Sequence, residues 1–253
     1  MSELSALIFD VDGTLADTER DGHRVAFNRA FNDASIDWNW DASLYGELLT
    51  VAGGKERMRF YLNKYCPDFA YPTNPDEFIA QLHAAKTEHY QQLVASGAIP
   101  LRPGVKRLII EARSQGVRLA IATTSALPNV IALLQKSLTS DAPEWFEVIA
   151  AGDVVPAKKP APDIYQYVLE KMSLSVDNCI AIEDSLHGLQ AATALGIKTV
   201  ITVNDYTQSE DFSEAILVLN HLGEAELPFN VISGDVKAAN YLNLELLRKL
   251  HAN

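Results

Sequence analysis

Acidic residues follow two stretches of the sequence that have the apolar composition of buried β-strands. The stretch "LIFDVDGTL" (residues 7–15) carries Asp10 and Asp12 after its apolar run, and "CIAIED" ends in Glu183 and Asp184. Carboxylates beside buried apolar residues are costly unless they are paired or bind a cation. This spacing indicates a site at which the acids share one small volume with a positively charged group.

Hydroxyl and ammonium groups accompany two further segments. Thr123, Thr124 and Ser125 follow "RLAIA", and Lys158 and Lys159 precede a helix expected from Pro162. Ligands of doubly wound sheets bind beyond the carboxyl ends of the strands, so we expect these groups and the four carboxylates at one rim. Because like charges repel, the acids need a partner, and Mg²⁺ is the usual cation where water and phosphate complete the oxygen ligands.

The elements that must position these groups alternate between strands and helices. Short apolar runs at 117–122, 147–152 and 197–203 are separated by amphipathic segments of ten or more residues. This pattern predicts a parallel sheet with helices on both faces, a doubly wound, Rossmann-like α/β core. We also expect the stretch at 236–253 to be a terminal amphipathic helix.

A different kind of segment interrupts the core pattern. Residues 16–100 have helical periodicity and almost no β-branched runs, and the segment closes on "GAIPLRPG", whose prolines and glycines break helices. We therefore expect an inserted α-helical cap domain at 16–100, with residues 1–15 and 101–253 forming the α/β core.

The overall composition excludes several classes of protein. The formal net charge of −12 argues against binding to nucleic acid, which depends on clustered lysine and arginine. The longest stretch without charge is interrupted by polar residues, so no membrane span is expected, and the amino-terminal stretch is not typical of a signal peptide. We expect a cytoplasmic monomer with two reduced cysteines that acts on a small molecule; a processed chain in a plastid stroma is the alternative.

The order of "DVDGT", "ATTS", "KKPAPDIY" and "AIEDS" resembles the four motifs of the haloacid dehalogenase-like phosphohydrolases. The resemblance covers roughly residues 4–205 and includes the helical cap of that family. It implies a Mg²⁺-dependent hydrolase whose residues have the following roles: nucleophile Asp10, general acid and base Asp12, phosphoryl-binding hydroxyl Thr123, adjacent cation Lys159, metal ligands Asp10, Asp184, Glu183 and the backbone carbonyl of Asp12, and substrate contacts Thr124 and Ser125.

The implied chemistry uses two aspartates differently. Asp10 attacks the phosphate ester in line and forms an aspartyl phosphate, which water then hydrolyses. Asp12, if turned away from the cation, can protonate the leaving alcohol. Mg²⁺, Lys159 and the Thr123 hydroxyl stabilise the charge that builds on the phosphoryl oxygens.

The cap segment offers a second set of polar residues. The stretch "TVAGGKER" (50–57) is not a Walker loop, because Leu49 replaces the first glycine and Glu56 follows the lysine. It could hold a second anionic group, although its charged residues could equally be ordinary solvated side chains. The candidate substrate-binding residues of the cap are Glu19, His23, Gly53, Gly54, Lys55, Arg57 and Lys86.

Within the family, the stretches "DVDGTLADTER", "GGKER", "HAAKTE" and "LAIATTSALPNV" are similar to the CbbY-type phosphatases, which act on xylulose-1,5-bisphosphate. That similarity implies a sugar phosphate or bisphosphate as substrate. A ketopentose with a phosphate at each end would suit Lys159 at one pole and Lys55, Arg57 and Lys86 at the other.

Three other functions compete with this one. A phosphosugar mutase could use the same cap and core, but the mutases that the chain resembles tend to carry a nonpolar residue in place of Thr14. A dehalogenase needs no Mg²⁺ and lacks the second acid at the position of Asp12. A signalling receiver phosphorylated on aspartate has neither the cap nor Asp12.

Overall fold

The structure is a computed structural model that describes residues 3–51, 53–236 and 239–252. The chain divides into two compact units. Met1–Asp17 and Pro100–Asn253 form one, here called the core unit, and Thr18–Ile99 form the other, the cap unit. These divisions lie two residues and one residue from the boundaries expected at 15/16 and 100/101.

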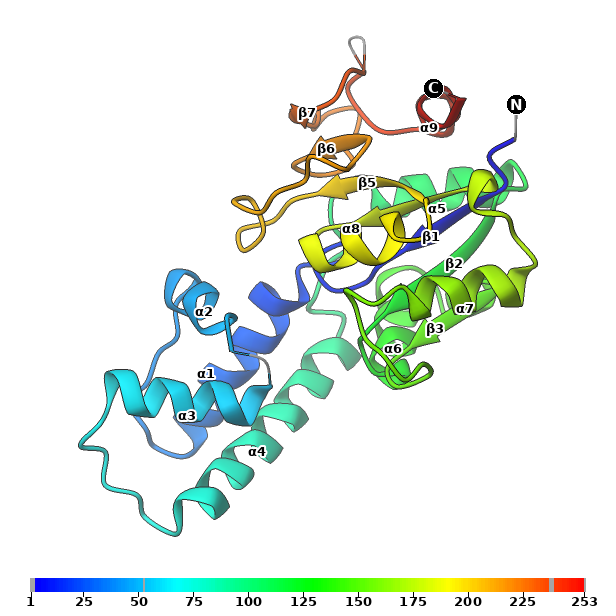
Figure 1. Cartoon of the computed structure of the whole chain (residues 1–253). Helices are drawn as coiled ribbons and strands as arrows, with labels where there is room; N and C mark the ends of the chain where they lie inside the picture. Colours follow the sequence, from blue (N-terminus) through cyan, green and yellow to red (C-terminus); the bar gives the residue numbers. More distant parts are fainter. Residues whose placement is uncertain (1–2, 52, 237–238, 253) are drawn as a thin grey trace. The chain divides into compact units, whose positions relative to one another are not determined.

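The core unit contains a seven-stranded sheet (Figure 1). In chain order its strands are β1 Ala6–Phe9, β2 Arg118–Thr123, β3 Val148–Ala151, β4 Cys179–Glu183, β5 Lys198–Thr202, β6 Leu217–Leu219 and β7 Val231–Ser233. Their spatial order is β3-β2-β1-β4-β5-β6-β7; all neighbours pair in parallel except β6 and β7, which are antiparallel. The predicted doubly wound parallel sheet is confirmed, and β6 and β7 extend it beyond the expected strands.

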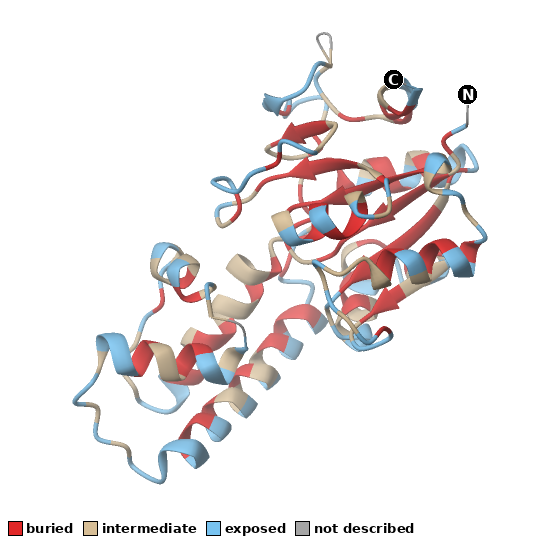
Figure 2. Cartoon of the chain, in the orientation of Figure 1, coloured by how far each residue is buried: buried red, intermediate tan, exposed pale blue. Residues whose placement is uncertain are grey.

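The central strand β1 is buried on both faces. Ala6 and Ile8 belong to the hydrophobic cluster beneath α7 Asp163–Met172, so the alternating side chains Leu7 and Phe9 point to the opposite face. All four residues are fully buried (Figure 2). Burial on both faces is why the strand is a continuous apolar run rather than an alternating one.

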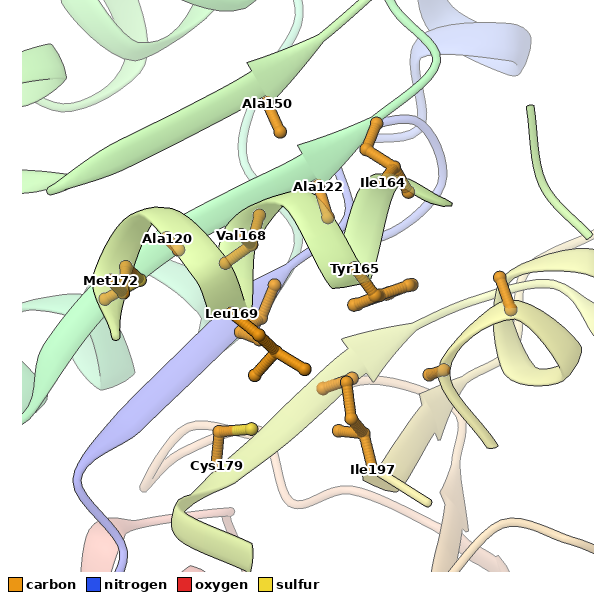
Figure 3. Close-up of a cluster of buried hydrophobic side chains, with 14 of the residues drawn as sticks. Ala120, Ala122, Ala150, Ile164, Tyr165, Val168, Leu169, Met172, Cys179 and Ile197 are labelled. Atoms are coloured by element: carbon orange, nitrogen blue, oxygen red, sulfur yellow. The ribbon is translucent and has the colours of Figure 1, made fainter. Parts of the chain in front are cut away.

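The other helices of the core unit are α5 Val105–Ser114, α6 Leu127–Ser137, α8 Leu186–Thr193 and α9 Leu244–Ala252, with short 3₁₀ turns at Ala142–Trp145 and Val176–Asn178. Helix α7 packs four side chains on the strands, as Figure 3 shows: Tyr165, Val168, Leu169 and Met172. Small residues of the strands, Ala120, Ala122 and Ala150, let this helix approach the sheet closely.

The carboxyl-terminal helix is shorter than expected. Helix was predicted over 236–253, but it begins only at Leu244, because the Asn243 side chain accepts a hydrogen bond from the amide of Leu246 at 2.9 Å and caps the first turn. Residues 237, 238 and 253 lie outside the described residues. Helix α9 packs against the amino ends of the strands, where the Lys198 ammonium donates to the His251 carbonyl at 2.7 Å.

The cap unit consists of helices: a π-helical turn η1 Thr18–His23, α1 Arg24–Asp33, α2 Ala42–Leu48, α3 Gly54–Tyr65 and α4 Pro75–Ala95. Two of them begin at capping side chains, Asp41 before α2 and Asn74 before α4. Their interior is rich in buried aromatic rings: Phe27, Phe31, Trp40, Tyr45 and Tyr61.

Among the described residues, no helix combines the length and the apolar character needed to cross a membrane.

Candidate active site

The candidate site lies where the strand order reverses. The chain runs outward from β1 through β2 to β3, then returns to the other side of β1 with β4 and continues to β5. Beyond the carboxyl ends of β1 and β4 the connections therefore leave in opposite directions, which is where α/β sheets bind ligands. Asp10 directly follows β1, and Glu183 and Asp184 lie at the end of β4.

The Lys159 ammonium contacts oxygen atoms at the carboxyl ends of three strands, β1, β2 and β4. It lies 2.6 Å from Asp10 Oδ1, 2.6 Å from Glu183 Oε1 and 2.8 Å from the carbonyl oxygen of Ala122 in β2. The lysine side chain is only 7% exposed, so these three oxygens replace the water that an ammonium normally binds. Lys158, in contrast, is exposed and pairs with Asp153, so it does not join the group at the rim as the sequence had suggested.

Three carboxylates converge beside this ammonium. One carboxylate oxygen from each of Asp10, Glu183 and Asp184 lies within 4.8 Å of the others, and all three residues are buried. One ammonium cannot balance three carboxylates, so the fully ionised group would carry an excess of two negative charges. Burial in low dielectric makes such an excess expensive, and either protons or a cation must compensate it.

The direction of the pKa shifts follows from this imbalance. Burial, together with the smaller effects of the Glu183 and Asp12 charges, raises the pKa of Asp10 to about 8 despite the lowering effect of Lys159. Burial and then the charges of Asp10 and Glu183 hold the pKa of Asp184 well above its usual value. Burial alone would lower the pKa of Lys159, but the two adjacent carboxylates outweigh it and raise that pKa. The surroundings thus favour the charged form of the lysine and the protonated forms of Asp10 and Asp184.

Asp12 has a different environment. Its side chain is half-buried, and its Oδ2 accepts a hydrogen bond of 2.6 Å from the Ser125 hydroxyl. Thr123 ends β2, is fully buried, and accepts the Ser125 amide at 3.2 Å through its hydroxyl oxygen. Thr124 is exposed. The loop after β2 therefore binds the side chain of Asp12, which is not part of the group formed by Asp10, Glu183 and Asp184.

Two glycines make room for the acids. Gly13 has φ +83°, and a Cβ built there would lie 2.2 Å from Asp184 Oδ2. A Cβ on Gly188, in the first turn of α8, would lie 1.9 Å from Glu183 Oε2. Asp184 therefore packs against the backbone that follows β1, and Glu183 against the amino end of α8, where the helix dipole favours a negative charge.

Two residues of this site were missed by the sequence analysis. The Tyr165 hydroxyl donates to Glu183 Oε1, and the Asn204 amide donates to Asp184 Oδ2 at 2.7 Å. Tyr165 lies in the quoted "KKPAPDIY" stretch, where no role was assigned to it. Asn204 follows the predicted strand at 197–203, so applying the strand-end rule to that strand would have found it.

The candidate residues of the cap unit form two groups. The Tyr45 hydroxyl lies 2.6 Å from Glu19 Oε2 and accepts a hydrogen bond of 2.8 Å from Arg57, which is itself 3.9 Å from Glu19. In the second group, the Lys86 ammonium lies 2.8 Å from His23 Nδ1, and the His23 ring stacks on Tyr90.

The remaining cap candidates lie at the start of α3. Gly53 and Lys55 are exposed, and Gly54 is half-buried against the His83 ring. Burial and then the charges of Lys86 and Lys55 lower the pKa of His83, which shows that both lysines are near this histidine. Arg57 and Lys86 are buried, so neither is an ordinary solvated side chain.

The donor set of the core unit fits Mg²⁺. Hard divalent cations prefer carboxylate oxygens, and Asp10, Asp184 and Glu183 offer three within one small volume. The Oε2 atom of Glu183 is buried and makes no hydrogen bond to any described residue, and the excess negative charge also calls for a cation. The acids could therefore hold a divalent cation in addition to the salt bridges that Asp10 and Glu183 make with Lys159.

Comparison with known proteins agrees with this geometry. A family model of haloacid dehalogenase-like hydrolases matches residues 4–196. The plasmid-encoded CbbY protein of Cupriavidus necator is 49% identical over 225 residues, which are 89% of this chain and 88% of that protein. A CBBY-like protein of Arabidopsis thaliana is 43% identical over 87% of this chain and 70% of its own length.

Solved structures of CbbY proteins are also similar to this chain. Crystal structures of CbbY from Rhodobacter sphaeroides, one with phosphate and one of a variant with xylulose-1,5-bisphosphate, are 45% identical to this chain. Each match has a TM-score of 0.71 and covers 86% of this chain and 94% of the other. The chain belongs to the haloacid dehalogenase-like hydrolase family and is a phosphoric monoester hydrolase of the CbbY type.

Proposed function

We propose that the chain is a Mg²⁺-dependent phosphatase that hydrolyses a small sugar bisphosphate, with xylulose-1,5-bisphosphate as the first candidate substrate. The observation that carries the proposal is the convergence of Asp10, Glu183 and Asp184 on Lys159 beyond the ends of β1 and β4. The crystal structure of CbbY from Rhodobacter sphaeroides with that sugar bisphosphate supports the choice of substrate.

In the proposed reaction, Asp10 attacks the phosphorus in line with the ester oxygen. The new bond to Asp10 forms as the bond to the sugar oxygen breaks, and Asp12 donates a proton to that oxygen. A water molecule, deprotonated by Asp12, then hydrolyses the aspartyl phosphate and releases inorganic phosphate. The Ser125 hydroxyl orients Asp12 through their 2.6 Å hydrogen bond, and the Lys159 ammonium stabilises the negative phosphoryl oxygens.

Asp10, Asp184 and Glu183, with the backbone carbonyl of Asp12, would hold Mg²⁺. When bound, the cation offsets the negative charge of the acids and of the phosphoryl group. Tyr165 and Lys159 both bind Glu183 Oε1, so they fix the orientation of that carboxylate.

The cap residues are proposed to bind the second phosphate. Lys55 is exposed, and the charges of both Lys55 and Lys86 lower the pKa of His83, so the surroundings of this histidine are positively charged. Glu19, Tyr45 and Arg57 form a hydrogen-bonded group suited to sugar hydroxyls. Gly53, which is exposed, and Gly54, which is half-buried, are proposed to contact the same anion through their backbone.

The test is release of inorganic phosphate from a panel of sugar phosphates with Mg²⁺, including xylulose-1,5-bisphosphate. We expect turnover that is highest on a bisphosphate, is lost with EDTA and returns when Mg²⁺ is added. Absence of turnover on every ester would contradict the proposal. Isomerised sugar phosphate without release of phosphate would instead make the protein a mutase.

The second-phosphate site has its own test. Lys55→Ala should reduce kcat/KM for a sugar bisphosphate by about tenfold, the usual effect of one lost charged contact, and leave a sugar monophosphate nearly unchanged. Lys64→Ala is the matched control, because Lys64 is another exposed lysine of α3 and is paired with Glu47. Equal losses on both substrates in Lys55→Ala would remove Lys55 from phosphate binding.

A further inference from the structure

Arg102 is a buried arginine in the core unit, two residues after the end of the cap unit. Its side chain is only 7% exposed, and its backbone amide donates to the Leu15 carbonyl at 2.8 Å. No role was assigned to it by the sequence motifs. A buried guanidinium needs hydrogen-bond acceptors for its five N–H groups, so its partners reveal what it does.

Most of the partners of Arg102 are backbone carbonyls at the carboxyl ends of strands. Its Nη1 donates to the carbonyls of Gly13 and, at 2.9 Å, Thr202. Its Nη2 donates to the carbonyls of Val203 at 2.5 Å and Asn220 at 2.8 Å. One planar group thus ties together the segments that follow β1, β5 and β6.

Two of these segments contact Asp184. A Cβ on Gly13 would lie 2.2 Å from Asp184 Oδ2, and the Asn204 side chain donates to the same oxygen at 2.7 Å. Arg102 binds the carbonyl of Gly13 itself and the carbonyl of Val203, which belongs to the peptide bond that leads into Asn204. The Arg102 guanidinium therefore binds the backbone at both residues, Gly13 and Asn204, that contact Asp184 Oδ2.

We propose that Arg102 is a positioning residue that holds Gly13 and Asn204 around Asp184 and so fixes this carboxylate for Mg²⁺ binding. The inference rests on the proposed function, because it assigns Asp184 to the cation. A lysine would keep the charge of Arg102, but its ammonium has three donors and no planar fork, so it cannot bind four carbonyls at once. Carbonyls left without a partner would move to find one, and Asn204 and Gly13 would move with them.

Arg107 provides a matched control in helix α5. Its Nη2 donates to the carbonyl of Gly223 at 2.8 Å, and its guanidinium also pairs with Glu111 and Glu224. Like Arg102, whose Nε also lies 3.3 Å from Asp17 Oδ1, it joins backbone carbonyls and carboxylates, but none of the named partners of Arg107 contacts Asp184. Loss of Arg107 tests the general cost of removing such a guanidinium.

The experiment compares Arg102→Lys, Arg107→Lys and the unmodified full chain by calorimetric titration with Mg²⁺, thermal unfolding and steady-state kinetics. We expect Arg102→Lys to raise the Mg²⁺ dissociation constant at least tenfold, to recover most of its kcat at saturating Mg²⁺ and to keep its KM for the sugar phosphate. Arg107→Lys should keep the Mg²⁺ dissociation constant within twofold of that of the unmodified chain, even if its unfolding temperature falls as much as that of Arg102→Lys.

An unchanged Mg²⁺ dissociation constant in Arg102→Lys, with only a lower unfolding temperature, would overturn the inference and leave the proposed function standing. Should Arg102→Lys fail to fold, Asn204→Ala replaces it, since this change removes the hydrogen bond on Asp184 that Arg102 is proposed to place, together with the one that Asn204 Oδ1 accepts from the Tyr206 amide. Unchanged Mg²⁺ binding in Asn204→Ala would equally overturn the inference. An unmodified chain that binds no Mg²⁺ would overturn both proposals together.

Discussion

Asp10 and Asp12 are identical side chains, one residue apart, whose surroundings differ. Asp10 is buried beside Lys159 and two other acids, whereas Asp12 is half-buried and bound to the Ser125 hydroxyl. A carboxylate held by an ammonium is oriented for attack on phosphorus, and one bound to a hydroxyl outside the acid cluster can exchange protons. In the proposed mechanism, the different roles of the two aspartates follow from these different surroundings.

Replacement of Asp10 tests the nucleophile. We expect Asp10→Asn to reduce phosphate release by at least 10⁴-fold, because an amide of nearly the same shape cannot form the covalent intermediate. Circular dichroism should show an intact fold. Asp163→Asn is the control, since Asp163 is the first residue of α7 and has no assigned chemical role. Substantial turnover by purified Asp10→Asn would remove Asp10 from the mechanism.

The raised pKa of Asp10 predicts how Mg²⁺ binding depends on pH. A folded-state pKa of about 8, against a usual 3.8, means that ionisation of Asp10 opposes folding, so the metal-free protein loses stability as pH rises from about 4 to about 8. Mg²⁺ must displace the proton, so its dissociation constant should fall about tenfold per pH unit below pH 8 and level off above it. Calorimetric titrations at pH 6 to 9, in buffers of different ionisation enthalpy, measure both the affinity and the protons released. A dissociation constant that is the same from pH 6 to 8 would show that Asp10 is already ionised without Mg²⁺.

At the scale of elements, the site depends on turns as much as on strands. The turn after β1 must bend back within a few residues, because the amide of Gly13 donates to the carbonyl of Ala16 at 2.8 Å. Its backbone at Gly13 has a positive φ and lies directly against Asp184. A residue with a side chain would meet both a conformational and a steric cost there.

Gly13→Ala and Gly196→Ala separate these two costs. Both glycines have φ +83°, but a Cβ on Gly196 meets no atom within 4 Å, whereas one on Gly13 would collide with Asp184 and Asn204. We expect Gly196→Ala to lose about 1–2 kcal/mol of unfolding free energy through backbone strain alone, with normal activity. Gly13→Ala should lose more than that and should also lose most of its Mg²⁺ affinity. Denaturant unfolding and calorimetry measure the two effects, and equal behaviour of the variants would show that Gly13 is needed only for its φ.

Across the whole molecule, the sequence predicted the parts whose physical signal is local. The run "ALIF" predicted β1, since burial on both faces leaves a continuous apolar strand. The acids that follow this run predicted the candidate site residues at its carboxyl end. Asn204 belongs to no short motif shared with Asp184, twenty residues away, so only its place directly after the predicted strand at 197–203 could have indicated it. The strands β6 and β7 have three residues each, too few for a period to appear, and they lie beyond the stretch that resembles the family.

Helix α9 contacts the amino ends of β4 and β5, opposite to the carboxyl ends where the candidate site residues lie. In α9, His251 Nε2 lies 2.8 Å from the carbonyl of Asp177, just before β4, and the His251 carbonyl accepts from Lys198, the first residue of β5. Leu244 and Leu247 of the same helix are fully buried. These contacts are at the amino ends of the strands, whereas the acids of the candidate site lie at the carboxyl ends, so we expect loss of α9 contacts to lower stability without changing the proposed catalysis.

Leu247→Ala tests this separation. Removing a fully buried leucine side chain costs about 3 kcal/mol, which for a protein of this size lowers the unfolding temperature by about 6 to 12 °C. Because Leu247 is in the helix that covers the amino ends of the strands, kcat, KM and Mg²⁺ affinity at 25 °C should stay within twofold of the unmodified chain. Leu246→Ala, at the half-buried neighbouring position, should lower the unfolding temperature by less than half as much. A large loss of kcat in folded Leu247→Ala would mean that α9 affects the site through the length of the strands. The amino and carboxyl ends of the sheet would then form one cooperative unit.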